Sequence, residues 1–273
     1  MDLLLTFFGG KKMKRSGVTA LFFMGLIVSL VVCLPICNAT SINYGTFTGS
    51  TVVYHNVTED SVTDAVPLFG TPIISGDTLD FNPIFKSYSA GSGASDMTDG
   101  QLLATIIAKD GKYIDNVTFH EAGDYRLLGA GTSATFAMVI NSLFINIYEV
   151  WNPITQATIS INPIQFTADM TFNPSNGDYY LTVDTQVAIW TGTVTADLTA
   201  KLAASGWANH YATKVSINLD NTLLTQSEAG TSAYIAKKDF NGLGITSDTF
   251  NIPEPMTMAI LGLGGLLLAR KRK

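Results

Sequence analysis

Apolar and polar residues alternate through much of the middle of this chain. In residues 214–220 (KVSINLD), Val215, Ile217 and Leu219 fall on one face and the polar residues fall on the other. A period of two that includes β-branched residues is typical of half-buried strands. In 181–190 (LTVDTQVAIW) the same period places Leu181, Val183, Thr185, Val187 and Ile189 on one face. The pattern predicts strands at 51–54, 102–108, 135–150, 157–172, 179–195, 214–224 and 232–236.

Turn-forming segments separate these strands: SGDTLDFNP, SAGSGASDMTDG, KDGK, EAGD and NPSNGDYY. Asn176-Gly177 in the last segment predicts a hairpin. Residues 195–205 (TADLTAKLAAS) predict a short helix that ends at Gly206. We therefore expect an all-β fold, an antiparallel β-sandwich or jelly-roll-like domain over 40–251. Two smaller sandwiches joined near Asn152-Pro153 are the alternative, and no repeat of fixed period is present.

The first 39 residues have the layout of a secretory signal peptide. In MKRSGVTALFFMGLIVSLVVCLPICNAT, which starts at Met13, two basic residues precede an apolar stretch over 18–34. Pro35 then breaks the helix, and small residues at Cys37 and Ala39 predict cleavage after Ala39. Met13 is a second possible start. The alternative is a membrane anchor that is retained, because the apolar stretch approaches the roughly 17–25 residues that a span needs.

The last 22 residues (252–273) combine an extended triplet, an apolar run and a basic end. Pro253-Glu254-Pro255 excludes regular helix and precedes the apolar run over 256–269. As a helix this run is about 21 Å long, short of the ~30 Å hydrocarbon core. The final Arg270, Lys271, Arg272 and Lys273 favour the cytoplasmic side. The pattern predicts a short, removable transmembrane helix, with a permanent tail anchor as the alternative.

This C-terminus resembles the PEP-CTERM sorting domain through three parts in the right order. They are the triplet at 253–255, the Gly/Leu-rich run AILGLGGLLL and the basic end at 270–273. The resemblance implies recognition of the triplet by an exosortase-type membrane protease and delivery to the cell surface or extracellular matrix of an exopolysaccharide-producing bacterium. The stretch YGTFTGSTVVYHNVTEDS…PLFGTPIISGDTLDFNP also resembles exported domains that precede such tails in planctomycete-type bacteria.

Charge and cysteine content narrow the function of the middle of the chain. Residues 40–252 carry 8 basic and 20 acidic residues, a formal charge of 8 − 20 = −12. Such a surface repels nucleic acid phosphates, so we expect no nucleic-acid partner. Cys33 and Cys37 both lie in the predicted signal peptide. The exported part would then have neither a disulfide nor a thiol nucleophile.

Candidate chemistry in the middle is sparse. His120-Glu121 is the most suggestive of the histidine-containing pairs, although an ordinary strand-end histidine is the simpler interpretation. Calcium is the better cofactor hypothesis, because it prefers oxygen ligands from Gly-rich loops. Its candidate ligands are Asp77, Asp80, Asp96, Asp99, Asp110 and Asp115. Aromatic residues that could stack on sugar rings, or equally fill a core, are Trp151, Trp190, Trp207, Tyr179 and Tyr180.

The sequence thus predicts a non-enzymatic exported protein, structural or adhesive within an exopolysaccharide layer, with no cofactor required. It would meet the membrane only through its terminal segments. A carbohydrate-binding module is the first alternative and requires exposed aromatics clustered on one sheet face. A secreted polysaccharide-active enzyme is the second and requires two facing carboxylates in a groove.

Overall fold

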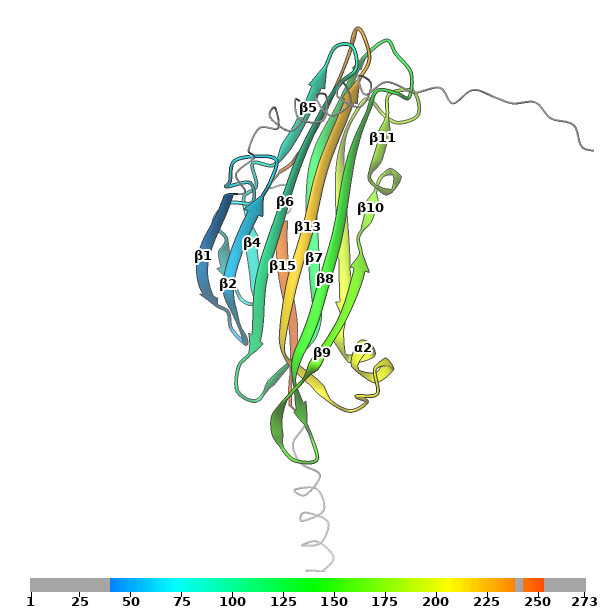
Figure 1. The fold of residues 1–273 in the computed structure, drawn as a ribbon. Coiled ribbons are helices and arrows are strands. Elements are labelled where there is room, and N and C mark those ends of the chain that lie inside the picture. The colour runs from blue at the N-terminus through cyan, green and yellow to red at the C-terminus, as the bar shows by residue number, and fades with distance from the viewer. Residues whose placement is uncertain (1–39, 239–242, 253–273) are drawn as a thin grey trace, which may run out of the picture. The chain divides into compact units, whose positions relative to one another are not determined.

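The described residues of this computed structural model, 40–238 and 243–252, form an antiparallel β-sandwich of two layers. The first layer is a continuous six-stranded sheet in which every neighbouring pair is antiparallel (Figure 1). In spatial order its strands are β1 (Thr40–Thr48), β2 (Val52–Ser61), β6 (Ala94–Ala108), β13 (Tyr211–Ser227), β8 (Phe136–Asn152) and β9 (Ala157–Asp169).

The second layer is built around β7 (Lys112–Gly129). One edge of β7 pairs with β12 (Val187–Asp197), which pairs in turn with β10 (Thr171–Asn173). The other edge pairs with β15 (Leu243–Asn251) along its first half and with β14 (Thr231–Lys237) along its second. Outside these lie β4 (Thr78–Phe81), β3 (Ile73–Ser75) and β5 (Lys86–Ala90).

Three small features connect the layers. The pairing of Ala212 in β13 with Ile114 in β7 joins the two sheets at one end. The 3-10 turn η1 (Ser175–Gly177) carries the chain from β10 in the second layer to β11 (Asp178–Tyr180), which pairs with β8 in the first. The helix α2 (Leu198–Ala204) follows β12 and buries Leu198 and Leu202.

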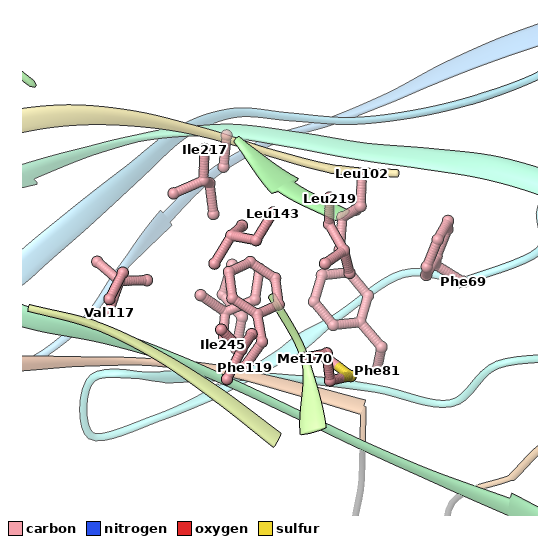
Figure 2. Packing of buried hydrophobic residues seen from close by; sticks show 14 of the residues in the cluster. Phe69, Phe81, Leu102, Val117, Phe119, Leu143, Met170, Ile217, Leu219 and Ile245 are labelled. Atoms are coloured by element: carbon pink, nitrogen blue, oxygen red, sulfur yellow. The ribbon is translucent and has the colours of Figure 1, made fainter. Parts of the chain in front are cut away.

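Alternate residues of both layers meet in a single apolar core (Figure 2). Leu102, Leu143, Ile217 and Leu219 point inward from the first layer, whereas Val117, Phe119 and Ile245 point inward from the second. Each of these side chains is at most 2% exposed. Burial at this level is what a period-two pattern produces when two sheets cover each other's inner faces.

Several sequence predictions are confirmed. The fold is all-β and antiparallel, and Val215, Ile217 and Leu219 share the buried face of β13. The short helix also forms, and the Asp197 carboxylate caps it by accepting the backbone N–H of Ala200 at 2.7 Å. Along the part of the chain that the structure describes, no helix is long and apolar enough to cross a membrane. The predicted signal-peptide helix within 1–39 and the transmembrane helix within 253–273 lie outside the described residues.

Other local predictions are wrong. The strand predicted over 179–195 is not continuous, because β12 begins only at Val187. Its buried face is that of Trp190, and Val187 and Ile189, which the pattern places together on an apolar face, point outward. Asn176-Gly177 links the two layers and does not close a hairpin. The segment EAGD, predicted as a turn, lies inside β7.

Asn152-Pro153, a possible domain boundary, lies instead at the β8–β9 connection. The two strands on either side of it pair directly, with Asn152 opposite Ala157. All strands on both sides of this turn belong to one connected sheet system. Within the described residues the sandwich is therefore a single structural unit.

Candidate functional site

The predicted sorting and processing residues cannot be placed in the structure. Ala39, Pro253, Glu254, Pro255, Arg270, Lys271 and Arg272 lie outside the described residues. The described chain ends at Ile252, whose backbone N–H donates to the Gly111 carbonyl at 2.9 Å.

The candidate calcium ligands are used mostly as local acceptors of protein hydrogen bonds. Asp77 accepts the Thr51 N–H at 2.7 Å, and Asp96 accepts the Tyr88 N–H at 2.8 Å. Asp115 accepts from Asn116 and Thr199, and Asp99 accepts from Thr222 at 2.8 Å. Asp80 and Asp110 are exposed on β4 and in the β6–β7 turn. Among the described residues no three His, Cys, Asp or Glu side chains converge to hold a metal ion, so the calcium hypothesis gains no support here.

The other candidate residues from the sequence differ in how deeply they are buried. His120 and Glu121 point to opposite faces of β7, since Glu121 is 1% exposed inside the sandwich and His120 is only half-buried on the outside. Trp190 and Tyr179 are fully buried, and the Tyr179 ring stacks on Tyr125 at 4.0 Å. Neither Trp190 nor Tyr179 can reach a sugar from the folded domain.

A cluster that the sequence did not indicate lies on the outer face of the second layer. Tyr88 on β5 and Tyr234 on β14 are directly opposite each other. Tyr234 is also opposite Arg126 on β7, which in turn is opposite Val187 on β12. Four strands thus place two tyrosines, an arginine and a valine in one row. Directly opposed side chains lie about 4.5–5.5 Å apart at Cβ, close enough to act as one surface.

Basic groups bracket the second tyrosine. The Arg126 guanidinium carbon lies 6.0 Å, and the Lys238 Nζ lies 5.9 Å, from the centroid of the Tyr234 ring. Asp124 anchors both, because its Oδ2 is 3.6 Å from Arg126 Nη2 and 2.8 Å from Lys238 Nζ. One carboxylate therefore holds two cations beside one ring, which leaves a local excess of positive charge.

The same face carries exposed apolar groups and two hollows. Tyr88 is 56% exposed, and the neighbouring exposed apolar residues are Ile84, Leu128, Val187 and Ile189. A hollow of about 400 Å³ is lined by Tyr88, Arg126, Leu128, Ser232 and Tyr234. A second, of about 450 Å³, shares Tyr234 and is lined further by Ile84, Lys86 and Lys238. We call the outer face formed by Tyr88, Tyr234, Arg126, Lys86, Lys238, Ile84 and Leu128 the tyrosine surface.

The tyrosine surface is basic within an acidic domain. Three of the 8 basic residues in 40–252 belong to it, namely Lys86, Arg126 and Lys238. Exposed apolar area next to fixed charge is typical of interaction sites. The sequence alone provides little indication of the tyrosine surface. Its tyrosines and its arginine come from three strands whose pairing a single sequence does not reveal.

Another hollow, of about 490 Å³, is lined by Trp151 and by the residues of the β6–β7 turn. Its lysines are held by the protein itself. Lys109 Nζ donates to the Gly49 carbonyl at 2.5 Å, and Lys112 Nζ donates to Asn251 Oδ1 at 2.6 Å. The charges of this hollow are therefore less available to a ligand than those of the tyrosine surface.

One carboxylate pair bears on the enzyme alternative. Asp99 on β6 and Asp220 on β13 lie on the outer face of the first layer, and burial together with the Asp99 charge and hydrogen bond raises the pKa of Asp220. A glycosidase also needs a groove between its two acids, and neither Asp99 nor Asp220 lines any of the three hollows described above.

Comparison with known proteins yields no family. No protein-family model matches the chain, and no curated protein matches it. Among solved structures, an endoglucanase 3 of family GH12 from Trichoderma harzianum is 9% identical with a TM-score of 0.24, covering 80% of this chain and 100% of that one. A family 12 xyloglucanase from Bacillus licheniformis is 12% identical with a TM-score of 0.20, covering 77% and 98%. Similarities of this size carry no inference about activity.

Proposed function

We propose that residues 40–252 form an exported, non-enzymatic adhesive domain that holds to an exopolysaccharide through the tyrosine surface. The observation that carries the proposal is the row Tyr88–Tyr234–Arg126, together with the Lys238 amine that lies over the Tyr234 ring. Aromatic faces pack on sugar rings, and a guanidinium can form paired hydrogen bonds with a carboxylate. The chemistry therefore fits a polysaccharide that carries carboxylate groups, such as a polyuronate.

Export and sorting are supported by the terminal segments of the sequence. The signal peptide would direct the chain out of the cytoplasm, and an exosortase-type protease would process the tail at Pro253-Glu254-Pro255. Replacement of the triplet by three alanines should leave the protein in the membrane fraction, whereas the native chain is released or displayed. Equal release of both proteins would contradict the sorting proposal.

The binding proposal is tested with polygalacturonate, using neutral dextran as the comparison polymer. We expect binding of the uronate at low salt and weaker binding as salt screens Arg126 and Lys238. Tyr234→Ala should weaken binding roughly tenfold, which corresponds to about 1.4 kcal/mol, and Arg126→Ala should weaken it while reducing its dependence on salt.

Phe144→Ala is the matched control for this test. Phe144 is an exposed aromatic, 41% accessible, on β8 in the opposite layer. The Phe144→Ala variant should bind polygalacturonate as the native protein does. Undiminished binding by Tyr234→Ala, or a loss on Phe144→Ala instead, would overturn the assignment of the site.

A further inference from the structure

A lysine, an asparagine and a glutamate meet inside the sandwich. Lys237 comes from the end of β14, Asn221 from the middle of β13 and Glu121 from β7, and they are 2%, 0% and 1% exposed. Lys237 Nζ donates to Asn221 Oδ1 at 2.6 Å and contacts Glu121 Oε2. Asn221 Nδ2 donates to the same Glu121 oxygen at 2.9 Å. We call these three residues the buried triad.

Aromatic rings surround the amine. Lys237 Nζ lies 5.5 Å from the ring centroids of both Phe85 and Trp190, which are themselves fully buried. Removal from water lowers the pKa of Lys237, although the Glu121 carboxylate opposes this. The uncharged amine is the nucleophilic form, and a desolvated lysine in an apolar pocket reaches it most easily.

Stability alone is a poor explanation for the triad. A buried ion pair is often no better than apolar residues of the same volume. Among the described residues, Glu121 Oε1 has no hydrogen-bond partner, and Trp190 Nε1 beside the amine has none either. Such unsatisfied buried atoms are costly. The arrangement points to chemistry within the core.

We propose that Lys237 and Asn221 join in an intramolecular isopeptide bond, with Glu121 transferring the protons. The neutral Nζ attacks the Asn221 carboxamide carbon, and Glu121 accepts a proton from the attacking nitrogen. It then returns this proton to Nδ2, the carbon–Nδ2 bond breaks and ammonia leaves. One carbon–nitrogen bond forms and one breaks, so no oxidant, reductant or water is consumed.

The geometry supports each part of this step. The hydrogen bond to Oδ1 holds the amine beside the carbon that it must attack, which removes most of the entropic cost of their encounter. Glu121 Oε2 contacts the attacking nitrogen and accepts from the leaving nitrogen, as a proton carrier must. Exclusion of water protects the intermediate from hydrolysis.

The bond would link the two layers covalently, since β13 belongs to the first and β14 to the second. Residues 40–252 contain no cysteine, so no disulfide can perform this role there. The closed ring would restrict the unfolded chain as a disulfide does. The inference is independent of the proposed function, because the bond would form in the folded domain whatever the tyrosine surface binds.

The test is peptide mass spectrometry of the purified full chain after tryptic digestion. Cleavage after Lys214 should release residues 215–238 as one peptide, lighter than its sequence by one ammonia and resistant to cleavage after Lys237. Its fragmentation should give no backbone ions from within 221–237. If this region instead has the full mass of its sequence and trypsin cuts after Lys237, the proposal is wrong. The measurement needs no variant.

Two variants separate the bond from a side reaction of the asparagine. A succinimide at Asn221 also loses ammonia, but it would persist in Lys237→Arg, whereas an isopeptide would not. Glu121→Gln should leave the peptide at full mass and cleavable after Lys237. Ammonia loss that survives in Lys237→Arg would refute the bond, and loss that survives in Glu121→Gln would refute the proton-transfer role.

Discussion

The inward face of β7 at Gly123 has no room for a side chain. Gly123 lies opposite Trp190 on β12 and opposite Lys237 on β14. A Cβ added there would lie 1.8 Å from the Ala236 carbonyl oxygen and 2.6 Å from the Trp190 indole nitrogen. Real Cβ atoms essentially never approach closer than 3.0 Å. In Gly123→Ala the Ala236 carbonyl would therefore have to move by about 3.0 − 1.8 = 1.2 Å.

That movement is expensive because Ala236 belongs to a paired strand. Overpacking of a core costs about 1–3 kcal/mol, and each ladder hydrogen bond lost between β14 and β7 adds about 0.5–1.5 kcal/mol. We expect Gly123→Ala to lower the free energy of unfolding by about 3 kcal/mol or more, a large part of the ~5–15 kcal/mol typical of a domain. With a urea slope of about 1–3 kcal/mol/M, the midpoint should fall by about 1 M or more.

Equilibrium urea unfolding measures this change, and Gly45→Ala is the control. Gly45 has φ +90°, and no atom of the described part of the chain lies within 4 Å of an added Cβ. An alanine there incurs only backbone strain, about 1–2 kcal/mol. If Gly123→Ala loses no more stability than Gly45→Ala, the clash with Ala236 is not rigid and the reasoning fails.

Three further predictions concern the rest of the sandwich. Burial and the nearby Asp99 raise the pKa of Asp220 in the folded protein. Ionisation of this carboxyl therefore lowers the free energy of unfolding as the pH rises from about 4, the pKa in the unfolded chain, through the higher pKa of the folded protein. Asp220→Asn should therefore melt higher than the native protein at pH 7 but not at pH 3, and an equal difference at both would contradict the shift. Asp197→Ala removes the cap on Ala200 of α2 and should cost about 1 kcal/mol in urea unfolding, whereas Asp197→Asn should cost much less. Phe119→Ala should cost about 3–5 kcal/mol in the same assay because it empties a fully buried site; a loss under 1 kcal/mol would mean that the core collapses around the gap.

The sequence pattern was sufficient where burial follows local alternation. The inward residues of β13 and the helix after Asp197 were predictable, because a strand with two distinct faces and a capped segment carry their signals locally. Strand β7 was not. Its segment EAGD contains a glycine and two acids, which favour a turn, but Glu121 is held inside by Lys237 and Gly123 gives room to Trp190. Both compensations come from distant strands.

The tyrosine surface was hidden for a related reason. Val187 and Ile189 of β12, which the pattern places on one apolar face, are 52% and 58% exposed, and Val187 continues the row that starts at Tyr88. Alternation locates two faces of a strand but does not say which one is covered. The three strands that carry Tyr88, Arg126 and Tyr234 meet only through long-range pairing, which no local property of the sequence predicts.

Strand β14 connects the two proposals. Tyr234 points outward into the tyrosine surface, and Lys237, three residues later, points inward to the buried triad. A slip of one residue in the pairing of β14 would exchange its faces, bringing a charged amine out and a tyrosine in. A bond from Lys237 to Asn221 forbids that slip. It would therefore hold Tyr234 opposite both Tyr88 and Arg126 while a polymer pulls on the outer face, which is the mechanical property that an adhesive domain requires.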